Sequence, residues 1–472
     1  MSALFKAMTR NDTVTENGMP TNSTSSGAIV DLFYTMGACR GGFDNYNKLI
    51  NLFTKSLASD PMLTVLSMFY NRDIRGGQGE RDTFRKMFDY LCKHRPDLAG
   101  RIIDLVPEYG RWDDIFVAFG TDMETLALNN IEYALLVEKN GLCAKWMPRE
   151  GKKGFDPFGL RIMKHLGLTR KAYRKLLSGL SQTVENDMCA NRWEAIKYSH
   201  VPSIAMHKYS KAFYKHTPEG FAKFILDVKS GKASIKSATL YPHDLLRNIW
   251  MHTGVESYRI EEQWRALPDY VPEGNSFIPV CDVSGSMLGT PMDVSVALGI
   301  YLSERNKSVF KDGFITFSET PVLQHLKGRL SEKARQLATS RWGMNTNLEA
   351  VFELILSKAI ASRLSKEDLP KTIIILSDMQ FDSCVRGASN SAMQMIRQKY
   401  TYYGYQIPNV VFWNLRDSEG VPVKYDESGT ALVSGFSPSI MKNLLSNELT
   451  PEVVVKATLL SERYALVAKR LQ

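Results

Sequence analysis

The chain has 472 residues, of which 44% are hydrophobic and 23% charged, and its formal net charge is +9 at pH 7. This composition is ordinary for a folded protein, and the length predicts two or three domains. The sequence has no run of about 18 apolar residues and no secretory signal at its start, which argues against a membrane protein.

Six cysteines, at positions 39, 92, 143, 189, 281 and 384, are scattered and form no C-x-x-C pair. This pattern predicts reduced, mostly buried thiols and argues against a disulfide framework or a zinc site. Reduced thiols are typical of a cytoplasmic protein, so the sequence predicts a cytoplasmic location.

The positive charge is unevenly distributed. Residues 271–472 hold 22 Lys and Arg against 20 Asp and Glu, so the remaining +7 lies in residues 1–270. Ten cations fall between residues 141 and 180, against Glu150 and Asp156. Such a local excess predicts an anionic partner for the N-terminal part of the chain.

Residues 1–27 are rich in Thr, Asn, Ser and Gly, and this composition predicts an extended N-terminal lead-in. From residue 28 to about 270, apolar residues recur at three- and four-residue spacing, which predicts an all-α domain of helical-repeat type. No strict sequence period accompanies it. The predicted helices are 28–36, 45–56, 61–71, 81–94, 98–106, 112–119, 126–141, 158–166, 170–186, 193–197, 202–215, 219–229 and 242–250.

Beyond residue 270 short apolar runs alternate with amphipathic helices. This alternation predicts a doubly wound α/β domain over residues 271–472. The run Thr372–Leu376 is continuously apolar after its first residue, as in strands buried on both faces. The predicted strands are 276–281, 313–317, 372–376, 409–414 and 430–434, and the predicted helices are 291–306, 348–362, 389–402, 438–446 and 451–471.

Oxygen-bearing side chains follow the predicted strands where ligands bind in such sheets. Asp282, Ser284 and Ser286 come directly after the first strand, Thr346 precedes the helix at 348, and Asp378 ends the central strand. Carboxylates and hydroxyls without His or Cys suit a hard cation, Mg²⁺ with Mn²⁺ or Ca²⁺ as alternatives. The alternative is a purely structural role, in which the serines cap a helix and Asp378 ends a strand.

This D-x-S-x-S arrangement, with a later Thr and a strand-ending Asp, resembles the metal-ion-dependent adhesion site of von Willebrand factor A domains. The resemblance implies that Ser284, Ser286 and Thr346 contact the metal directly. It also implies that Asp282 and Asp378 act directly or through water, and that one coordination position stays open for an acidic group.

A second resemblance covers most of the chain. Its N-terminal part is similar to a largely uncharacterised family of viral, plant and fungal proteins with a helical region before an A-type domain. More distantly it resembles the Ro autoantigen (TROVE) proteins, which implies binding of structured non-coding RNA and, for a viral chain, the host cytoplasm. The stretches that carry this similarity begin at Thr15 (TENGM), Asp73 (DIRGGQGER), Tyr109 (YGRWD), Ala144 (AKWMPR), Met188 (MCANRW) and Val201 (VPSIAM).

Candidate RNA-binding residues follow from the basic region, where aromatic residues are interleaved with cations. Cations for phosphates and aromatics for stacking suit looped or single-stranded RNA. The alternative is a solvated basic helix pair whose aromatics belong to the core. The candidates are Lys145, Arg149, Lys152, Lys153, Arg161, Lys164, Arg170, Lys171, Arg174 and Lys175.

Two other motifs have competing interpretations. The glycine-rich stretch 75–81 could cradle a phosphate or form a tight turn between helices. Residues 109–114 could form a ligand-recognition site, or they could begin a helix whose N-terminus is stabilised by acidic residues. Cys281 ends a predicted buried strand, so it is interpreted as a packing residue rather than a nucleophile.

The sequence therefore predicts a binding protein rather than an enzyme. It predicts an RNA-binding helical scaffold joined to a metal-dependent A-type domain that engages an acidic group. The alternative is a metal-dependent protein-assembly module that does not bind nucleic acid. A metal-dependent hydrolase is the third hypothesis, and Asp382 is the extra carboxylate near Asp378 that it would use.

Overall fold

The computed structural model describes residues 13–40, 43–150, 156–249, 254–317, 321–339, 346–382, 392–417, 419–444 and 449–472. Two compact units emerge, each built from two stretches of chain. The first unit comprises Met1–Thr64 and Leu240–Leu459, and the second comprises Val65–Thr239 and Leu460–Gln472. The expected domains at 28–270 and 271–472 follow the change in secondary structure, whereas the compact units follow packing.

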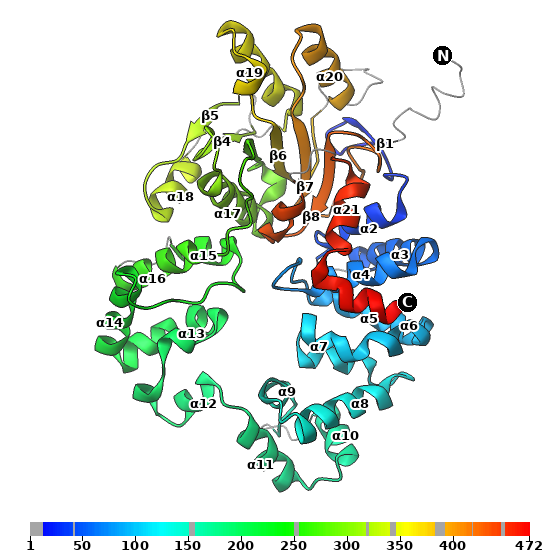
Figure 1. The fold of residues 1–472 in the computed structure, drawn as a ribbon, viewed down its shortest axis with the longest axis vertical. Helices are drawn as coiled ribbons and strands as arrows, with labels where there is room; N and C mark the ends of the chain where they lie inside the picture. The colour runs from blue at the N-terminus through cyan, green and yellow to red at the C-terminus, as the bar shows by residue number, and fades with distance from the viewer. Residues whose placement is uncertain are drawn as a thin grey trace. The chain divides into compact units, whose positions relative to one another are not determined.

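The first unit is built on a six-stranded sheet with the order β5-β4-β3-β6-β7-β8 (Figure 1). Five strands run parallel, and β5 pairs antiparallel with β4 at one edge. This arrangement confirms the coarse prediction of a helical region followed by an α/β domain. The strands are β3 (Phe277–Cys281), β4 (Gly313–Thr316), β5 (Leu323–His325), β6 (Thr372–Ser377), β7 (Asn409–Asn414) and β8 (Thr430–Ser434).

The central strands form because their residues are apolar on both faces. Every residue of β3 and of β6 is buried. By contrast, β5 is short, lies at the sheet edge and alternates between exposed and half-buried residues, which is why its sequence did not predict a strand.

Helices cover this sheet and complete the unit. Helix α17 (Thr290–Arg305) packs against β3, β4 and β6. It lies so close that a Cβ on Gly299 would be 2.2 Å from the Cys281 sulfur. The other helices of the unit are α2 (Ala28–Met36), α3 (Phe43–Ser59), α15 (Pro242–Ile249), α16 (Gly254–Arg265), α18 (Leu330–Thr339), α19 (Leu348–Ala361), α20 (Ala392–Tyr402) and α21 (Pro451–Leu459).

Helix α2 packs against β8 although the two lie some 400 positions apart in the sequence. The Ser434 hydroxyl donates to the Phe33 carbonyl oxygen at 2.9 Å and accepts from the Gly37 N–H at 3.2 Å. Helix α2 therefore belongs to the sheet unit, although its periodicity alone placed it in the helical region.

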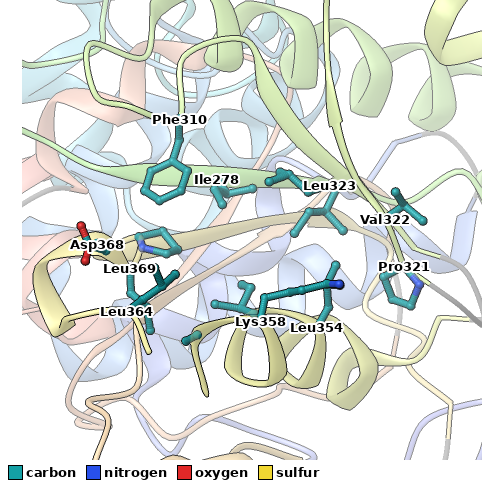
Figure 2. Close-up of a pocket in the computed structure, with 14 residues that line it drawn as sticks. Ile278, Phe310, Pro321, Val322, Leu323, Leu354, Lys358, Leu364, Asp368 and Leu369 are labelled. Carbon is teal, nitrogen blue, oxygen red and sulfur yellow. The ribbon is translucent and has the colours of Figure 1, made fainter. Parts of the chain in front are cut away.

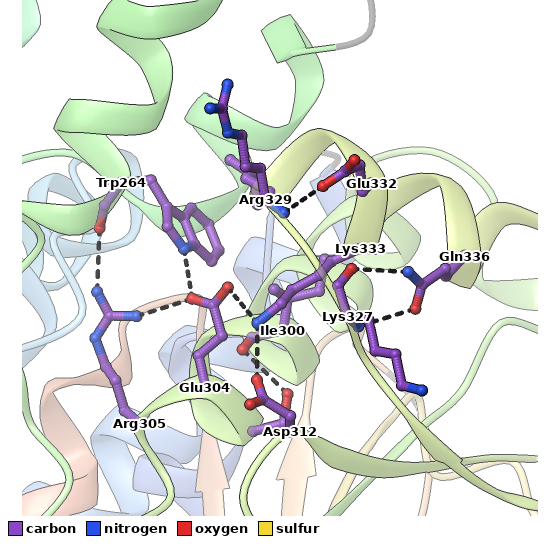
Figure 3. Close-up of polar contacts among 12 residues, drawn as sticks. Trp264, Ile300, Glu304, Arg305, Asp312, Lys327, Arg329, Glu332, Lys333 and Gln336 are labelled. Atoms are coloured by element: carbon purple, nitrogen blue, oxygen red, sulfur yellow. Dashed lines mark hydrogen bonds and ion pairs between the residues drawn. The ribbon is translucent and has the colours of Figure 1, made fainter.

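A buried lysine ties three helices of this unit together (Figure 3). Lys333 on α18 is 7% exposed, and its Nζ lies 3.0 Å from Glu304 on α17 and 2.7 Å from Asp312. Trp264 on α16 donates its indole N–H to the same Glu304 at 2.7 Å. Since a lone charge is costly to bury, two carboxylates stabilise this lysine inside the unit.

The second unit is helical, and its described residues contain no strand. Predicted helices at 170–186 and 451–471 are each interrupted, and residues 133–137 adopt a π-helical turn instead of continuing an α-helix. The helices of this unit are α5 (Asp82–His94), α6 (Pro96–Ile102), α7 (Val106–Tyr109), α8 (Glu124–Glu132), α9 (Gly141–Trp146), α10 (Pro157–His165), α11 (Arg170–Leu180), α12 (Val184–Cys189), α13 (Ser203–His216), α14 (Pro218–Lys229) and α22 (Ala465–Leu471), and α4 (Pro61–Arg72) leads into it.

No helix among the described residues is both long enough and apolar enough to cross a bilayer.

Candidate metal centre

The sheet order creates a crevice between the carboxyl ends of β3 and β6. The chain passes from β3 to β4 on one side, and β6 then pairs with the opposite side of β3. Connections that leave neighbouring parallel strands in opposite directions open a crevice at their carboxyl ends, where α/β proteins bind ligands. The loops that begin at Asp282 and Asp378 both start there.

Asp282 is fully buried at the end of β3. Its Oδ1 accepts the Ser284 N–H at 2.9 Å, and its Oδ2 accepts the Ser377 hydroxyl at 2.5 Å. Its backbone N–H donates to the Leu376 carbonyl at 2.9 Å, which continues the pairing of β3 with β6. These bonds fix the carboxylate at the crevice.

Asp378 forms the other side of the crevice and is 2% exposed. Burial, and then the negative charge of Asp378, raise the pKa of Asp282 to about 6. Neither carboxylate has a cationic side chain as an ion-pair partner in the part of the chain that the structure describes. Two buried carboxylates within electrostatic reach of each other require a proton or a cation between them.

Hydroxyl groups lie in the loops that carry these carboxylates and in the Thr346 segment bonded to one of them. The Ser284 and Ser286 hydroxyl oxygens lie 3.0 Å apart, with Ser284 5% exposed and Ser286 exposed. Thr346 is 1% exposed, and its hydroxyl donates at 2.7 Å to the Gln380 carbonyl, two residues beyond Asp378. The structure thus brings the five predicted residues to one end of the sheet, with Thr346 linked to the others through the Gln380 loop.

The donor set fits a hard divalent cation. Among the described residues, no group of three or more His, Cys, Asp and Glu side chains could hold a metal. Any cation here would therefore depend on hydroxyl oxygens beside the two carboxylates, which Mg²⁺ accepts together with water. The buried carboxylate pair without a cationic partner is the observation that favours such an ion.

An N-terminal strap, which we define as residues 13–27, packs across the Thr346 side of the site. It includes β1 (Thr13–Val14) and β2 (Pro20–Thr21). The Asn17 side-chain amide donates to the Gln380 carbonyl at 2.8 Å and to the Thr346 hydroxyl at 3.4 Å. The predicted extended lead-in is therefore part of the site's support where it is described.

Further bonds fasten the strap to the loop after β6. The Thr15 hydroxyl donates to the Phe381 carbonyl at 2.7 Å, and the Glu16 N–H donates to the Gln380 side chain at 2.6 Å. Gly18 forms a bridge with Asp382. Sequence reasoning singled out this stretch as distinctive but had no signal that linked it to the site, because the partners are more than 360 residues apart.

Two other residues at the site were not predicted. Tyr34 on α2 has a fully buried hydroxyl without a hydrogen-bond partner among the described residues. Burial, and then Asp378, raise the pKa of Tyr34 well above its ordinary value, so the two groups lie within electrostatic reach. Arg416, in the loop after β7, donates from its guanidinium to the Ser286 carbonyl.

Neither Cys281 nor Asp382 supplies evident catalytic machinery. Burial, and then the charge of Asp282, raise the pKa of Cys281 to about 12, so the thiol stays protonated and acts as a packing group. Asp382 accepts the Thr346 N–H at 2.7 Å, so its carboxylate is engaged in holding the Thr346 loop.

An apolar pocket of about 510 Å³ lies elsewhere in the same unit (Figure 2). It is lined by β3, β4, β5 and α19, with Ile278 and Leu369 near the amino ends of β3 and β6. Lys358 and Asp368 are its charged residues. Because it lies toward the opposite ends of the strands, this pocket is separate from the carboxylate pair.

The basic region of the second unit is partly neutralised by carboxylates, two of which come from outside residues 141–180. Eight of the ten candidate cations are described, whereas Lys152 and Lys153 lie outside the described residues. Lys145 pairs with Glu185 at 3.6 Å and Arg161 with Glu124 at 2.9 Å, while Arg170 and Arg174 share Glu150 at 3.4 and 3.3 Å. Arg149 donates to the Ser181 hydroxyl at 2.7 Å.

Three candidate lysines remain exposed without an ion-pair partner in the described ranges: Lys164 on α10, and Lys171 and Lys175 on α11. Two of the interleaved aromatics are used in packing, since Tyr173 is fully buried and the half-exposed Phe158 stacks on Phe116 at 5.6 Å, whereas Phe155 lies outside the described residues. The region therefore offers cations for phosphates but few free rings for base stacking.

The glycine-rich stretch 75–81 forms a structural turn. The N–H groups of Gly77, Gln78 and Gly79 all donate to backbone carbonyls of residues 70 and 73. A Cβ on Gly77 would lie 1.9 Å from the Tyr70 carbonyl oxygen, so only glycine fits. These N–H groups are not available to a phosphate, which favours the turn interpretation.

Residues 109–114 are also structural. Asp114 is fully buried and pairs with Arg72 and Arg85, each at 2.7 Å. It also accepts the Arg111 N–H at 2.9 Å. A carboxylate enclosed in this way stabilises the helical unit and is not presented to a ligand.

Comparisons with known proteins match two parts of the chain, one before and one after residue 275. Residues 276–464 match a domain of unknown function, DUF7788, and residues 15–105 and 161–274 match a second one, DUF2828. Over 489 aligned positions the chain is 30% identical to the uncharacterized protein L728 of Acanthamoeba polyphaga mimivirus, which covers 92% of this chain and 84% of that protein.

Proposed function

This chain belongs to the family of the mimivirus protein L728, and from that premise we propose that it is a metal-dependent binding protein rather than an enzyme. Its α/β domain is of the von Willebrand A type, and Asp282, Ser284, Ser286, Thr346 and Asp378 hold a divalent cation. The observation that supports this proposal is the buried Asp282–Asp378 pair, which lacks a cationic partner among the described residues and whose loops are bonded to three hydroxyl-bearing residues.

Mg²⁺ is the proposed ion, with Mn²⁺ or Ca²⁺ as alternatives. It would act as a Lewis acid that accepts an oxygen from outside the chain. The chain's own residues perform the rest: two carboxylates balance the charge of the ion, and neutral hydroxyls leave it electrophilic. Ser377 and Asn17 hold Asp282 and Thr346 in place.

Mg²⁺ should therefore raise the unfolding temperature of the metal-free protein, and EDTA should reverse the shift. An ion that binds only the folded state adds about 2.7 kcal/mol of stability at a hundred times its dissociation constant. Differential scanning fluorimetry across a Mg²⁺ series checks this. An unchanged midpoint up to about 10 mM Mg²⁺, Mn²⁺ and Ca²⁺ would contradict metal binding.

The helical unit is the proposed RNA-binding scaffold, by analogy with the Ro (TROVE) proteins. Its support is the set of exposed lysines at 164, 171 and 175 on α10 and α11, which have no ion-pair partner in the described ranges. Salt bridges at the exposed surface are weak, so Arg161, Arg170 and Arg174 can exchange their carboxylates for phosphates.

Replacing Lys164, Lys171 and Lys175 with glutamine should flatten the salt dependence of RNA binding. Each lost phosphate contact lowers the slope of log affinity against log salt by about 0.7, so the triple variant should lose about 2. Fluorescence anisotropy with a single-stranded RNA checks this. A control triple variant at Lys93, Lys229 and Lys232 should retain the wild-type slope, and equal slopes for all three proteins would refute the RNA proposal.

The alternative function is a metal-dependent protein-assembly module that does not bind nucleic acid. It is favoured by the packing of the aromatic residues in the basic region, which removes most of the stacking surface. Purification with and without EDTA separates the two functions, since a protein partner would be lost in EDTA and no RNA would co-purify.

We place the protein in the cytoplasm, and in the host cytoplasm if the chain is viral, in keeping with its free cysteines.

A further inference from the structure

Arg416 brings a guanidinium to the rim of the candidate metal centre. It follows β7, the neighbour of β6, so its loop leaves the sheet at the same edge as Asp378. The Leu415 N–H donates to the Ser377 carbonyl at 3.0 Å, which ties this loop to the residue before Asp378. The guanidinium itself donates to the Ser286 carbonyl.

Among the described residues, one bond occupies the Arg416 guanidinium. One of its N–H groups is used by Ser286, and no carboxylate pairs with it in the described part of the chain. The adjacent Asp417 does not neutralise it, because Asp417 pairs with Lys48 at 2.6 Å. An exposed guanidinium fixed by one N–H leaves its other donors free to form two parallel bonds to an oxyanion.

The charge at the rim depends on this residue. Asp282 and Asp378 together carry two negative charges when ionised, and a divalent cation cancels them. Arg416 then adds one positive charge that no described side chain balances. An oxygen ligand that reaches the cation would meet the guanidinium beside it.

We propose that Arg416 and the metal together bind one carboxylate of an acidic protein partner, the metal taking one oxygen and the guanidinium the other. This inference rests on the proposed metal-binding function, takes the acidic ligand that the resemblance implies, and adds the recognition residue. A guanidinium places two N–H donors in the plane of a carboxylate, which matches a group with two equivalent oxygens.

Charge favours a carboxylate over a terminal RNA phosphate. A carboxylate carries one negative charge, which balances the single excess positive charge of the metal-loaded site. A terminal phosphate carries about 1.5 to 2 negative charges near pH 7.

The test uses the full chain, Mg²⁺, and two small probes, acetate and inorganic phosphate. Calorimetry first measures Mg²⁺ affinity, and NMR line broadening or thermal shift then measures probe affinity for the Mg²⁺-loaded protein. The variants are Arg416→Ala, Arg416→Lys and the control Lys371→Ala. Lys371 is an exposed cation at the opposite end of β6, so the control removes the same charge from the same unit.

The expected result is that Arg416→Ala weakens acetate binding about tenfold or more without weakening Mg²⁺ binding. Arg416→Lys, which keeps the charge and loses the planar fork, should fall between it and wild type, and Lys371→Ala should match wild type. Because removing a nearby positive charge cannot harm cation binding electrostatically, retained Mg²⁺ affinity separates recognition from a folding defect.

Two results would overturn the proposal. Acetate affinity that is equal in Arg416→Ala and wild type would remove Arg416 from recognition. An Arg416-dependent preference for phosphate over acetate would assign the site to a phosphorylated ligand instead of a carboxylate. Absence of Mg²⁺ binding in the wild-type protein would be a failure of the proposed function itself, which the first calorimetric step detects separately.

Discussion

Replacing Asp282 with asparagine is expected to stabilise the metal-free protein near pH 8 and to abolish its response to Mg²⁺. The pKa of Asp282 rises from 3.8 to about 6 in the folded state, first because of burial and then because of Asp378. The ionised form is therefore unfavourable in the folded protein without a cation. Asparagine removes that charge and can still accept the Ser284 N–H.

The sign follows from proton linkage. A carboxyl group with a raised folded-state pKa binds its proton more tightly when folded, so the free energy of unfolding falls as pH rises from about 4 to about 6. One pH unit corresponds to about 1.4 kcal/mol, so the cost at pH 8 is on the order of 3 kcal/mol. Because Asp282 is fully buried, solvent screening does not reduce this penalty.

Denaturant unfolding in EDTA at pH 5 and pH 8 measures the effect. The Asp282→Asn variant should be more stable than wild type at pH 8, with a smaller difference at pH 5. Its Mg²⁺ affinity should fall by more than the roughly 10- to 100-fold cost of losing an outer-shell partner. Asp426→Asn, an exposed change in the same unit, should alter neither property, and a variant that still binds Mg²⁺ would rule Asp282 out as a ligand.

Replacing Asp114 with alanine should destabilise the helical unit by about 3–5 kcal/mol. The change leaves Arg72, which is 5% exposed, as a buried cation without its carboxylate, and it also removes one of the two carboxylates that pair with Arg85. The Arg111 N–H loses its acceptor as well. Unfolding followed by tryptophan fluorescence measures the loss, since Trp112 and Trp146 lie in this unit.

Asp113→Ala provides the matched control. Asp113 also pairs with arginines, at 2.7 Å to Arg111 and 2.9 Å to Arg85, but its side chain is 20% exposed. Partly solvated pairs contribute on the order of 1 kcal/mol, so the control should lose far less. Equal losses for the two variants would show that burial of Asp114 is not what makes it structural.

The strands and their terminal carboxylates could be predicted because both signals are local. Three isoleucines and a leucine follow Thr372 and mark a strand buried on both faces. Asp378 is the first residue after this strand. Strands β7 and β8 begin and end at the predicted residues. The alternation of strands and helices then places Asp282 and Asp378 at one edge of the sheet by topology.

Elements without a one-sided apolar pattern could not be predicted. Helix α16 carries charged residues around its circumference, and Arg259 within it is buried through a bond to Glu256. Helix α18 is anchored by the buried Lys333, a residue that periodicity assigns to solvent. In both, buried charged residues held by ion pairs replace part of the apolar pattern, and for Lys333 the partners lie 21 and 29 positions earlier, where periodicity gives no signal.

The supporting residues of the site were missed for a related reason. Asn17 and Arg416 reach it through one or two side-chain hydrogen bonds from loops, and neither belongs to a periodic pattern. Ser377 is the exception, because it directly precedes Asp378 and could have been included from its position alone. The local motif predicts the candidate metal ligands, whereas most residues that hold those ligands in place come from distant segments and leave no local signal.

The strap at residues 13–27 also has a consequence for biosynthesis. Its Thr15 hydroxyl bonds to the carbonyl of Phe381, 366 positions later, and Asn22 pairs with Val421. A ribosome adding about 5–20 residues per second needs tens of seconds to make the intervening chain. During that interval the strap has no docking site, so the end of the sheet that carries the candidate metal centre can be completed only late in translation, and nascent-chain chaperones have time to engage this segment first.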